Sequence, residues 1–171
     1  MPRHAAFGVG LGDLDIVVID DSEAMLSILR AILGAFGVAS LRLFDNSERA
    51  LDAMINEPPH LVLMDWRMRP IEGHELLKTI RSRHMAPLCY AAVMVVSGHA
   101  SEDLVRRAFI AGANQFLVKP VAPTTVLGRL VWLQHDTREL VLAGGRYAVE
   151  GVERAFGSGR GRQRIMLDAD G

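Results

Sequence analysis

The sequence has little cysteine, because Cys89 is the only one among 171 residues. A single thiol forms no disulfide within the chain and provides no thiolate cluster for zinc. A disulfide-stabilised secreted scaffold and a Cys-type zinc module are therefore excluded. We expect a protein of the reducing cytoplasm.

The sequence also lacks an excess of charge of one sign, since 19 Lys and Arg residues stand against 20 Asp and Glu residues and the net charge is -1. Proteins that bind nucleic acid through their overall charge are strongly basic, so we expect no nucleic-acid partner. No apolar run approaches the roughly 18 residues that span a bilayer, so we expect no membrane partner either.

Half of the residues are apolar, and many of them lie in short runs. Four such runs cover residues 16–19, 61–64, 91–96 and 116–118. They are apolar without alternation, which is typical of strands buried on both faces of a parallel sheet. A fifth run at residues 38–44 alternates and includes Arg42, which suits an edge strand.

A segment with helical periodicity follows each predicted strand. In the first of them, apolar residues recur every three or four positions from Met25 to Phe36, and Gly37 ends the pattern. Similar patterns predict helices near residues 47–57, 75–83, 101–110 and 123–135. Strand and helix alternate five times, which predicts an α/β fold with a doubly wound parallel sheet.

The composition changes after about residue 136, where Gly and Arg become frequent. We expect one domain over residues 12–136 and a C-terminal extension over residues 137–171, which is too short for a core of its own. Within the extension, residues 147–156 predict a short amphipathic helix with Val149, Val152 and Phe156 on one side. Residues 157–171 have a flexible composition, so we expect the extension to be partly flexible.

Polar residues follow the predicted buried strands at the points where the strands end. In chain order these residues are Asp20, Asp21, Asp65, Ser97 and Lys119. Ligands of open parallel sheets bind at the carboxyl ends of the strands, so we expect one site. Two carboxylates about 4 Å apart repel each other by roughly 4 kcal/mol at an effective dielectric constant near 20, so three of them require a cation. Carboxylate oxygens suit Mg2+.

The spacing of these residues resembles a known family. The motifs are the acidic pair Asp20-Asp21, then Asp65 with Gly73 eight residues later, then Ser97 with Lys119-Pro120 twenty-two residues later. In this combination they resemble the receiver domain of two-component response regulators, over about residues 12–136. The resemblance implies a flavodoxin-like (βα)5 fold with the strand order 2-1-3-4-5. It also implies a signalling protein, with no enzyme activity beyond its own phosphorylation and autodephosphorylation.

The resemblance assigns a role to each site residue. Asp65 is the expected phosphoacceptor, and its expected donor is a histidine kinase or a histidine phosphotransfer protein. Asp20, Asp21, Asp65 and the backbone carbonyl of Arg67 are the expected ligands of Mg2+. Lys119 is expected to pair with a phosphoryl oxygen.

The resemblance also implies how phosphorylation changes the protein. Ser97 would donate its hydroxyl to the phosphoryl group and move inward, and Phe116 would turn inward with it. These two switch residues would repack the face made by the fourth helix, the fifth strand and the fifth helix. Because too few residues follow for a DNA-binding effector domain, we expect this face to contact an unknown downstream protein. A phosphorylation-dependent homodimer stays open.

Two other functions fit part of the pattern. A receiver-like module could bind a partner without being phosphorylated, although all five site positions carry competent residues. A haloacid-dehalogenase-like phosphatase also combines a nucleophilic Asp, a hydroxyl, a Lys and an acidic pair with Mg2+. In that family the nucleophile comes first and a second Asp stands two residues later. Here the acidic pair comes first, and Arg67 stands two residues after Asp65.

We also predict the degree of burial of two conspicuous residues outside the motifs. Trp66, beside the expected phosphoacceptor, is expected at the solvent edge, where it would serve as a fluorescence reporter. Cys89 lies between apolar residues and is expected to be buried and unreactive.

Overall fold

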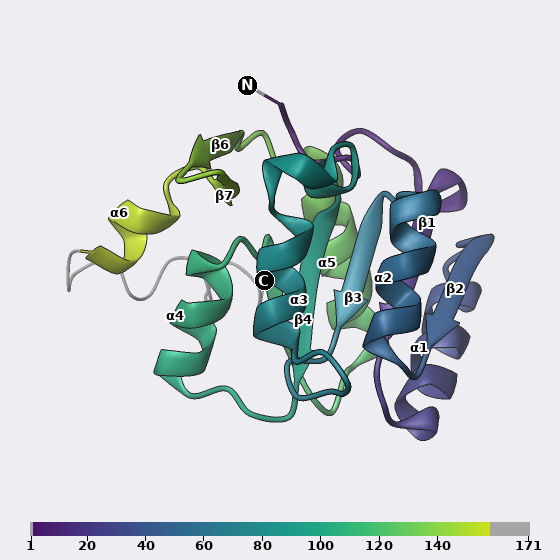
Figure 1. Ribbon diagram of the computed structural model, residues 1–171. Helices are drawn as coiled ribbons and strands as arrows, with labels where there is room; N and C mark the ends of the chain where they lie inside the picture. The colour runs from purple at the N-terminus through teal and green to yellow at the C-terminus, as the bar shows by residue number, and fades with distance from the viewer. Residues whose placement is uncertain (1, 158–171) are drawn as a thin grey trace.

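A five-stranded parallel sheet forms the centre of the computed structural model, which describes residues 2–157. Its strands are β1 (Asp15–Ile19), β2 (Ser40–Phe44), β3 (Leu61–Met64), β4 (Ala92–Ser97) and β5 (Gln115–Val118). They lie in the order β2-β1-β3-β4-β5, which confirms the flavodoxin-like order that the resemblance implied. In Figure 1 the strands run through the middle of the molecule, between two layers of helices.

The burial of the strands follows their sequence patterns. Every residue of β3 and β4 is buried, as expected for apolar runs without alternation. The edge strand β2 is half-buried beyond its exposed first residue, and Arg42 within it pairs with Asp15 of β1 at 2.9 Å. The predictions for β2, β3 and β4 are therefore confirmed, whereas Val118 at the end of β5 is 40% exposed and departs from the predicted burial.

A helix follows each of the five strands, as the sequence predicted. These helices are α1 (Glu23–Ala35), α2 (Ser47–Asn56), α3 (Gly73–Ile80), α4 (Glu102–Ile110) and α5 (Pro123–His135). Helices α2, α3 and α4 bury their apolar sides in the core on one face of the sheet, and α1 and α5 do so on the other. No helix within residues 2–157 is long and apolar enough to cross a membrane.

Local sequence signals explain where several helices begin. Ser22, Asn46 and Ser101 each accept a hydrogen bond from a backbone N–H in the first turn of α1, α2 and α4. Pro123 opens α5, where its missing N–H costs no helical hydrogen bond. Three short 3-10 turns complete the connections, namely η1 (Leu11–Asp13), η2 (Arg83–Met85) and η3 (Leu88–Tyr90).

The C-terminal extension differs from its prediction. Instead of a helix over residues 147–156, an antiparallel hairpin of β6 (Leu140–Ala143) and β7 (Arg146–Val149) precedes α6 (Val152–Gly157). Gly144 and Gly145, both at positive φ, make the turn that brings β7 back onto β6. Gly151, at φ 83, then separates strand from helix. The flexible stretch predicted for residues 157–171 falls almost entirely outside the described residues.

The described part of the extension packs on α3 and α4, at the left of Figure 1. Leu140, Val149 and Val152 are buried in the same hydrophobic core cluster as the apolar sides of these helices. The ring of Phe156 stacks on that of Phe109 in α4, with the centroids 5.8 Å apart. The boundary at residue 136 stays a prediction, but apolar side chains from both sides of it share one core.

A buried charged group holds the N-terminal segment against the start of the extension. Asp136 is 5% exposed, and Arg138 Nε donates a hydrogen bond of 2.9 Å to its carboxylate. On its other side, His4 Nε2 lies 3.6 Å from Asp136 Oδ2. Burial alone would raise the pKa of Asp136, but His4 and Arg138 outweigh it and hold this pKa at about 2.

We expect Asp136→Asn to lower the free energy of unfolding at neutral pH by about 2 kcal/mol. A depressed pKa stabilises the fold above the ordinary pKa of an aspartate, and this stability is lost as the pH falls towards 2. Urea unfolding at several pH values checks this, with the exposed Asp52→Asn as control. If the free energy of unfolding depends on pH equally in the Asp136→Asn variant and in the wild type, the lowered pKa of Asp136 is contradicted.

Candidate functional site

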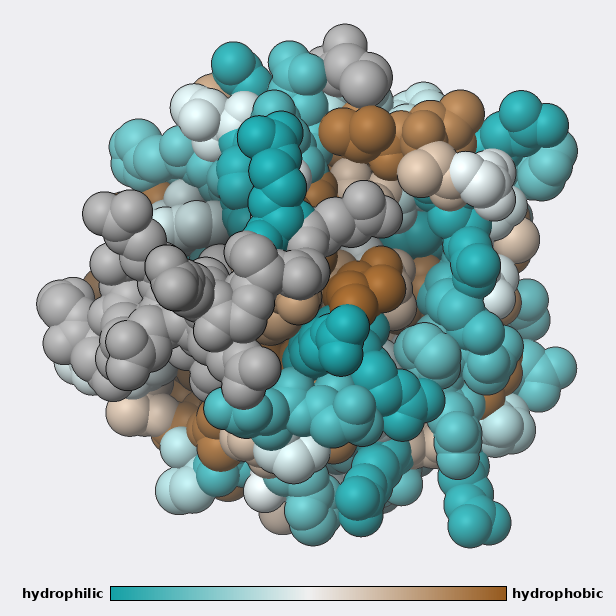
Figure 2. All heavy atoms as spheres, turned by 90° about the vertical axis from the view of Figure 1, so that its left-hand side faces the viewer, coloured by the Kyte–Doolittle hydropathy of each residue, from teal (hydrophilic) through white to brown (hydrophobic). Residues whose placement is uncertain are grey.

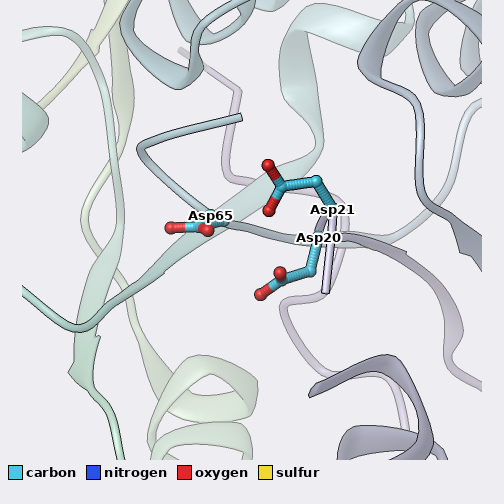
Figure 3. Close-up of side chains that lie close together, drawn as sticks. All are labelled: Asp20, Asp21 and Asp65. Atoms are coloured by element: carbon cyan, nitrogen blue, oxygen red, sulfur yellow. The ribbon is translucent and has the colours of Figure 1, made fainter. Parts of the chain in front are cut away.

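Three carboxylates meet at the carboxyl edge of the sheet. Asp20 and Asp21 follow β1 directly, and Asp65 follows β3, its neighbour in the sheet. One carboxylate oxygen from each lies within 4.8 Å of the others, and Figure 3 shows the three side chains side by side. The parallel register explains this proximity, because Ile19 and Met64, the last residues of the two strands, are partners.

Lys119 supplies a positive charge to this acidic cluster. It follows β5, and its backbone N–H donates to Ser97 O at 2.8 Å, which places it at the same edge of the sheet. Its ammonium Nζ lies 2.8 Å from Asp20 Oδ2 and 3.4 Å from Asp65 Oδ2. The lysine therefore bridges the two buried carboxylates.

Backbone N–H groups orient the other oxygens of these two carboxylates. Asp20 Oδ1 accepts a hydrogen bond of 2.9 Å from Ser22 N, and Asp65 Oδ1 accepts one of 3.3 Å from Arg67 N. Both donors stand two residues after the acceptor, which is the spacing of an Asx turn. Each buried carboxylate thus has one oxygen held by the backbone and one directed at Lys119.

Burial shifts the protonation equilibria of the site. Burial, and after it the charge of Asp20, raises the pKa of Asp65 above its usual value, and Lys119 offsets only part of this. Burial alone would lower the pKa of Lys119, but its hydrogen bond to Asp20 and the two carboxylate charges raise it. Lys119 is therefore a cation at neutral pH, whereas Asp65 takes up a proton at a higher pH than an ordinary aspartate.

The residues predicted for the switch lie on β4, which neighbours β3 in the sheet, and on β5, which lies beyond β4. Ser97 ends β4 and is 1% exposed, and its Oγ accepts a hydrogen bond from His99 N at 3.1 Å. Phe116 in β5 pairs with Val95 and is 3% exposed, with its ring in the core beneath α4. The structure thus brings Asp20, Asp21, Asp65 and Lys119 into direct proximity. Ser97 lies at the same edge of the sheet, whereas Phe116 lies in the core, and their role as switch residues stays a prediction.

The expectation for Trp66 is wrong, because its side chain is only 7% exposed and belongs to the hydrophobic core. Its ring lies 5.4 Å from that of His74 at the start of α3. A Cβ atom at Gly73 would come within 2.7 Å of backbone atoms of Asp65 and Trp66, so glycine allows α3 to approach this closely. The glycine eight residues after Asp65 was the signal that could have predicted this burial.

The donor set of the cluster fits a hard divalent cation. It consists of carboxylate oxygens alone, at separations that one ion can bridge. Mg2+ prefers oxygen ligands and is commonly held by one or two carboxylates together with water and phosphate oxygens. The backbone carbonyl of Arg67 as a further ligand stays a prediction.

Comparison with known proteins identifies the family. Residues 16–131 match the sequence model of the response regulator receiver domain. The sensory/regulatory protein RpfC of Xanthomonas campestris pv. campestris is 33% identical over 138 residues, which are 81% of this chain. The chain spans 18% of the length of RpfC, so the match concerns one part of that protein.

Solved structures agree in fold. The complex of CheX, CheY, BeF3 and Mg2+ from Borrelia burgdorferi matches with a TM-score of 0.64 and 25% identity, over 73% of this chain and 93% of that one. The complex of the phosphotransfer protein Ypd1 with the receiver domain of Ssk1 from Saccharomyces cerevisiae matches with a TM-score of 0.63 and 20% identity, over 71% and 88% of the two chains. With its strand order, its acidic edge and a family match over most of its length, this chain belongs to the response regulator receiver domains of two-component and phosphorelay signalling systems.

Proposed function

We propose that this receiver is phosphorylated on Asp65 in a Mg2+-dependent reaction. The observation that carries the proposal is the position of Lys119 Nζ between the carboxylates of Asp20 and Asp65, with Asp21 beside them. The fixed ammonium of Lys119 next to the Asp65 carboxylate can stabilise the negative charge of an incoming phosphoryl group.

In the proposed reaction, an oxygen of the Asp65 carboxylate attacks the phosphorus atom of a phosphohistidine. The P–O bond forms as the P–N bond to the donor imidazole breaks, and the imidazole nitrogen regains a proton. Asp65 is well suited because Arg67 N holds its Oδ1, which leaves Oδ2 directed at Lys119.

Mg2+ would be held by Asp20, Asp21, Asp65 and the Arg67 carbonyl, and when bound it would neutralise carboxylate charge and withdraw charge from the phosphoryl oxygens. The solved CheX–CheY complex named above contains Mg2+ with BeF3, which supports this choice of cation. Lys119 would then exchange part of its contact with Asp20 and Asp65 for a phosphoryl oxygen.

We propose that Ser97 and Phe116 pass the change on to the surface formed by α4, β5 and α5. Ser97 Oγ now accepts from His99 N, so a hydrogen bond from Ser97 to the phosphoryl group would pull on the loop that leads to α4. Phe116 is already buried, and phosphorylation would therefore stabilise this inward orientation. An unknown downstream protein would bind the repacked surface.

The proposed phosphodonor is a histidine kinase or a histidine phosphotransfer protein. The solved complex of Ypd1 with the Ssk1 receiver supports the second of these by its fold, although that chain is only 20% identical to this one. RpfC is described as a sensory and regulatory protein, which fits a role of the matching segment in signal reception.

The test is intact-mass measurement after incubation with a small phosphodonor, with and without Mg2+, on the wild type and on Asp65→Ala. We expect one added phosphoryl group, only with Mg2+ present and Asp65 intact. No adduct in the wild type, with a cognate kinase also failing, would support a module that binds partners without phosphorylation. Sustained release of phosphate from a phosphoester would instead support the hypothesis of a haloacid-dehalogenase-like phosphatase.

A further inference from the structure

A second polar pocket lies where the C-terminal extension packs on the receiver. It has a volume of about 330 Å3, and α3, α4 and the hairpin β6–β7 each contribute side chains to its wall. The family match ends at residue 131, so the wall made by the hairpin is an addition to the receiver fold. None of the three clustered aspartates lines this pocket.

Each of the three elements contributes a cationic side chain to the pocket. Lys78 comes from α3, Arg107 from α4 and Arg146 from β7. Lys78 pairs with Glu75 at 2.8 Å, but neither arginine forms an ion pair with any residue in the described part of the chain. Among residues 2–157, the positive charges of Arg107 and Arg146 at the pocket therefore have no ion-pair partner.

The same positive charges act on the pKa of His74, which also lines the pocket. Burial lowers the pKa of His74, and the charges of Lys78, Arg107 and Arg146 lower it further, against the opposing charge of Glu75. The imidazole is therefore neutral at neutral pH and offers a hydrogen bond without adding to the positive charge.

Apolar side chains form the rest of the wall. Ile110 and Ala111 lie one turn beyond Arg107 on the same side of α4, and Tyr147 stands next to Arg146 in the hairpin. Figure 2 views the side of the molecule that carries α4 and α6, and it shows hydrophilic side chains around smaller hydrophobic patches. The pocket thus combines fixed cations with an apolar surface, a combination typical of sites for small organic anions.

We propose that this pocket binds a small organic phosphate. A phosphomonoester has three terminal oxygens and a charge near -2, which suits cationic groups that approach from three separate elements. Guanidinium groups match phosphate oxygens in geometry, and the apolar wall would receive the organic part. Residues 158–171 contain three Arg and two Asp, so that segment does not have the negative charge that the pocket selects.

The ligand would join α3, α4 and the extension, and its binding would stabilise their packing. The test uses the full chain in buffer with EDTA, where no Mg2+ can hold phosphate at the aspartates. Phenyl phosphate is the probe, and phenol is the uncharged control. We expect saturable binding of phenyl phosphate in calorimetry, an increase in Tm, and a rise of the His74 pKa in NMR titration, because a bound anion opposes the surrounding cations.

Arg107→Gln and Arg146→Gln are each expected to weaken this binding about tenfold or more. Arg106→Gln is the matched control, because Arg106 is exposed on α4 but does not line the pocket. Absence of saturable binding to the wild type would overturn the proposal. An equal loss of affinity in Arg106→Gln would also overturn it, because it would indicate a general effect of charge. Phosphorylation of Asp65 plays no part in this test, so its outcome is independent of the proposed function.

Discussion

Replacement of Lys119 by methionine is expected to slow phosphorylation of Asp65 about 10²- to 10³-fold, the usual loss when one fixed electrostatic contact to a developing charge is removed. The affinity for Mg2+ should instead increase in this variant. The ammonium lies 2.8 Å from Asp20 and 3.4 Å from Asp65, where it competes with the metal for their oxygens. Tighter Mg2+ binding together with slower phosphorylation separates this role of Lys119 from a simple loss of folding.

The measurements are Mg2+ titration followed by Trp fluorescence and the rate of phosphoryl uptake by intact mass. Lys78→Met is the matched control, because this lysine pairs with Glu75 on α3. Lys119→Arg, which keeps the charge, should recover part of the rate. An unchanged rate in Lys119→Met would mean that the lysine only balances charge in the unphosphorylated protein.

Arg81→Met is expected to destabilise the fold by at least about 3 kcal/mol, because it leaves several buried oxygens without a donor. Arg81 is 0% exposed, and burial lowers its pKa to about 10, so it is still a cation at neutral pH. It donates hydrogen bonds of 2.7–2.9 Å to the carbonyls of Cys89, Ala91 and Gly112 and to Asn114 Oδ1. These contacts connect the end of α3 to the segments that lead into β4 and β5.

Urea unfolding checks this expectation. Arg83→Met, two residues away and exposed, should cost less than about 0.5 kcal/mol. If Arg81→Met does not fold, Arg81→Lys provides the comparison, since a lysine keeps the charge but reaches fewer of the acceptors. A stability of Arg81→Met close to that of the wild type would show that burying this charge costs as much as its hydrogen bonds contribute.

The sheet and its helices were predictable because each is specified by its own residues. Apolar runs without alternation identified β3 and β4, and Pro123 marked the start of α5. The helix predicted for residues 147–156 forms only from Val152 onward, because residues 146–149 pair with residues 140–143 in the hairpin. The turn at Gly144 and Gly145 and the packing on α3 favour this pairing, and neither is visible in a short window of sequence.

The gathering of Asp20, Asp21, Asp65 and Lys119 was predictable to the edge of the sheet, since the carboxyl ends of parallel strands all lie at one edge. That Lys119 Nζ lies closer to Asp20 than to Asp65 was not predictable, because this depends on the course of the loops after β1 and β5. The burial of Trp66 was misjudged for a related reason. Its position beside the expected phosphoacceptor suggested the solvent edge, whereas Gly73, seven residues later, determines how closely α3 covers it.

The apolar contacts of Leu140, Val149 and Val152 with the receiver core have a consequence for where this chain can be shortened. A chain that ends with the family match at residue 131 would lack these side chains and would expose the core surface that they cover. We therefore expect residues 2–157 to behave as one unit in unfolding, in which the hairpin and α6 protect the core of the receiver from solvent.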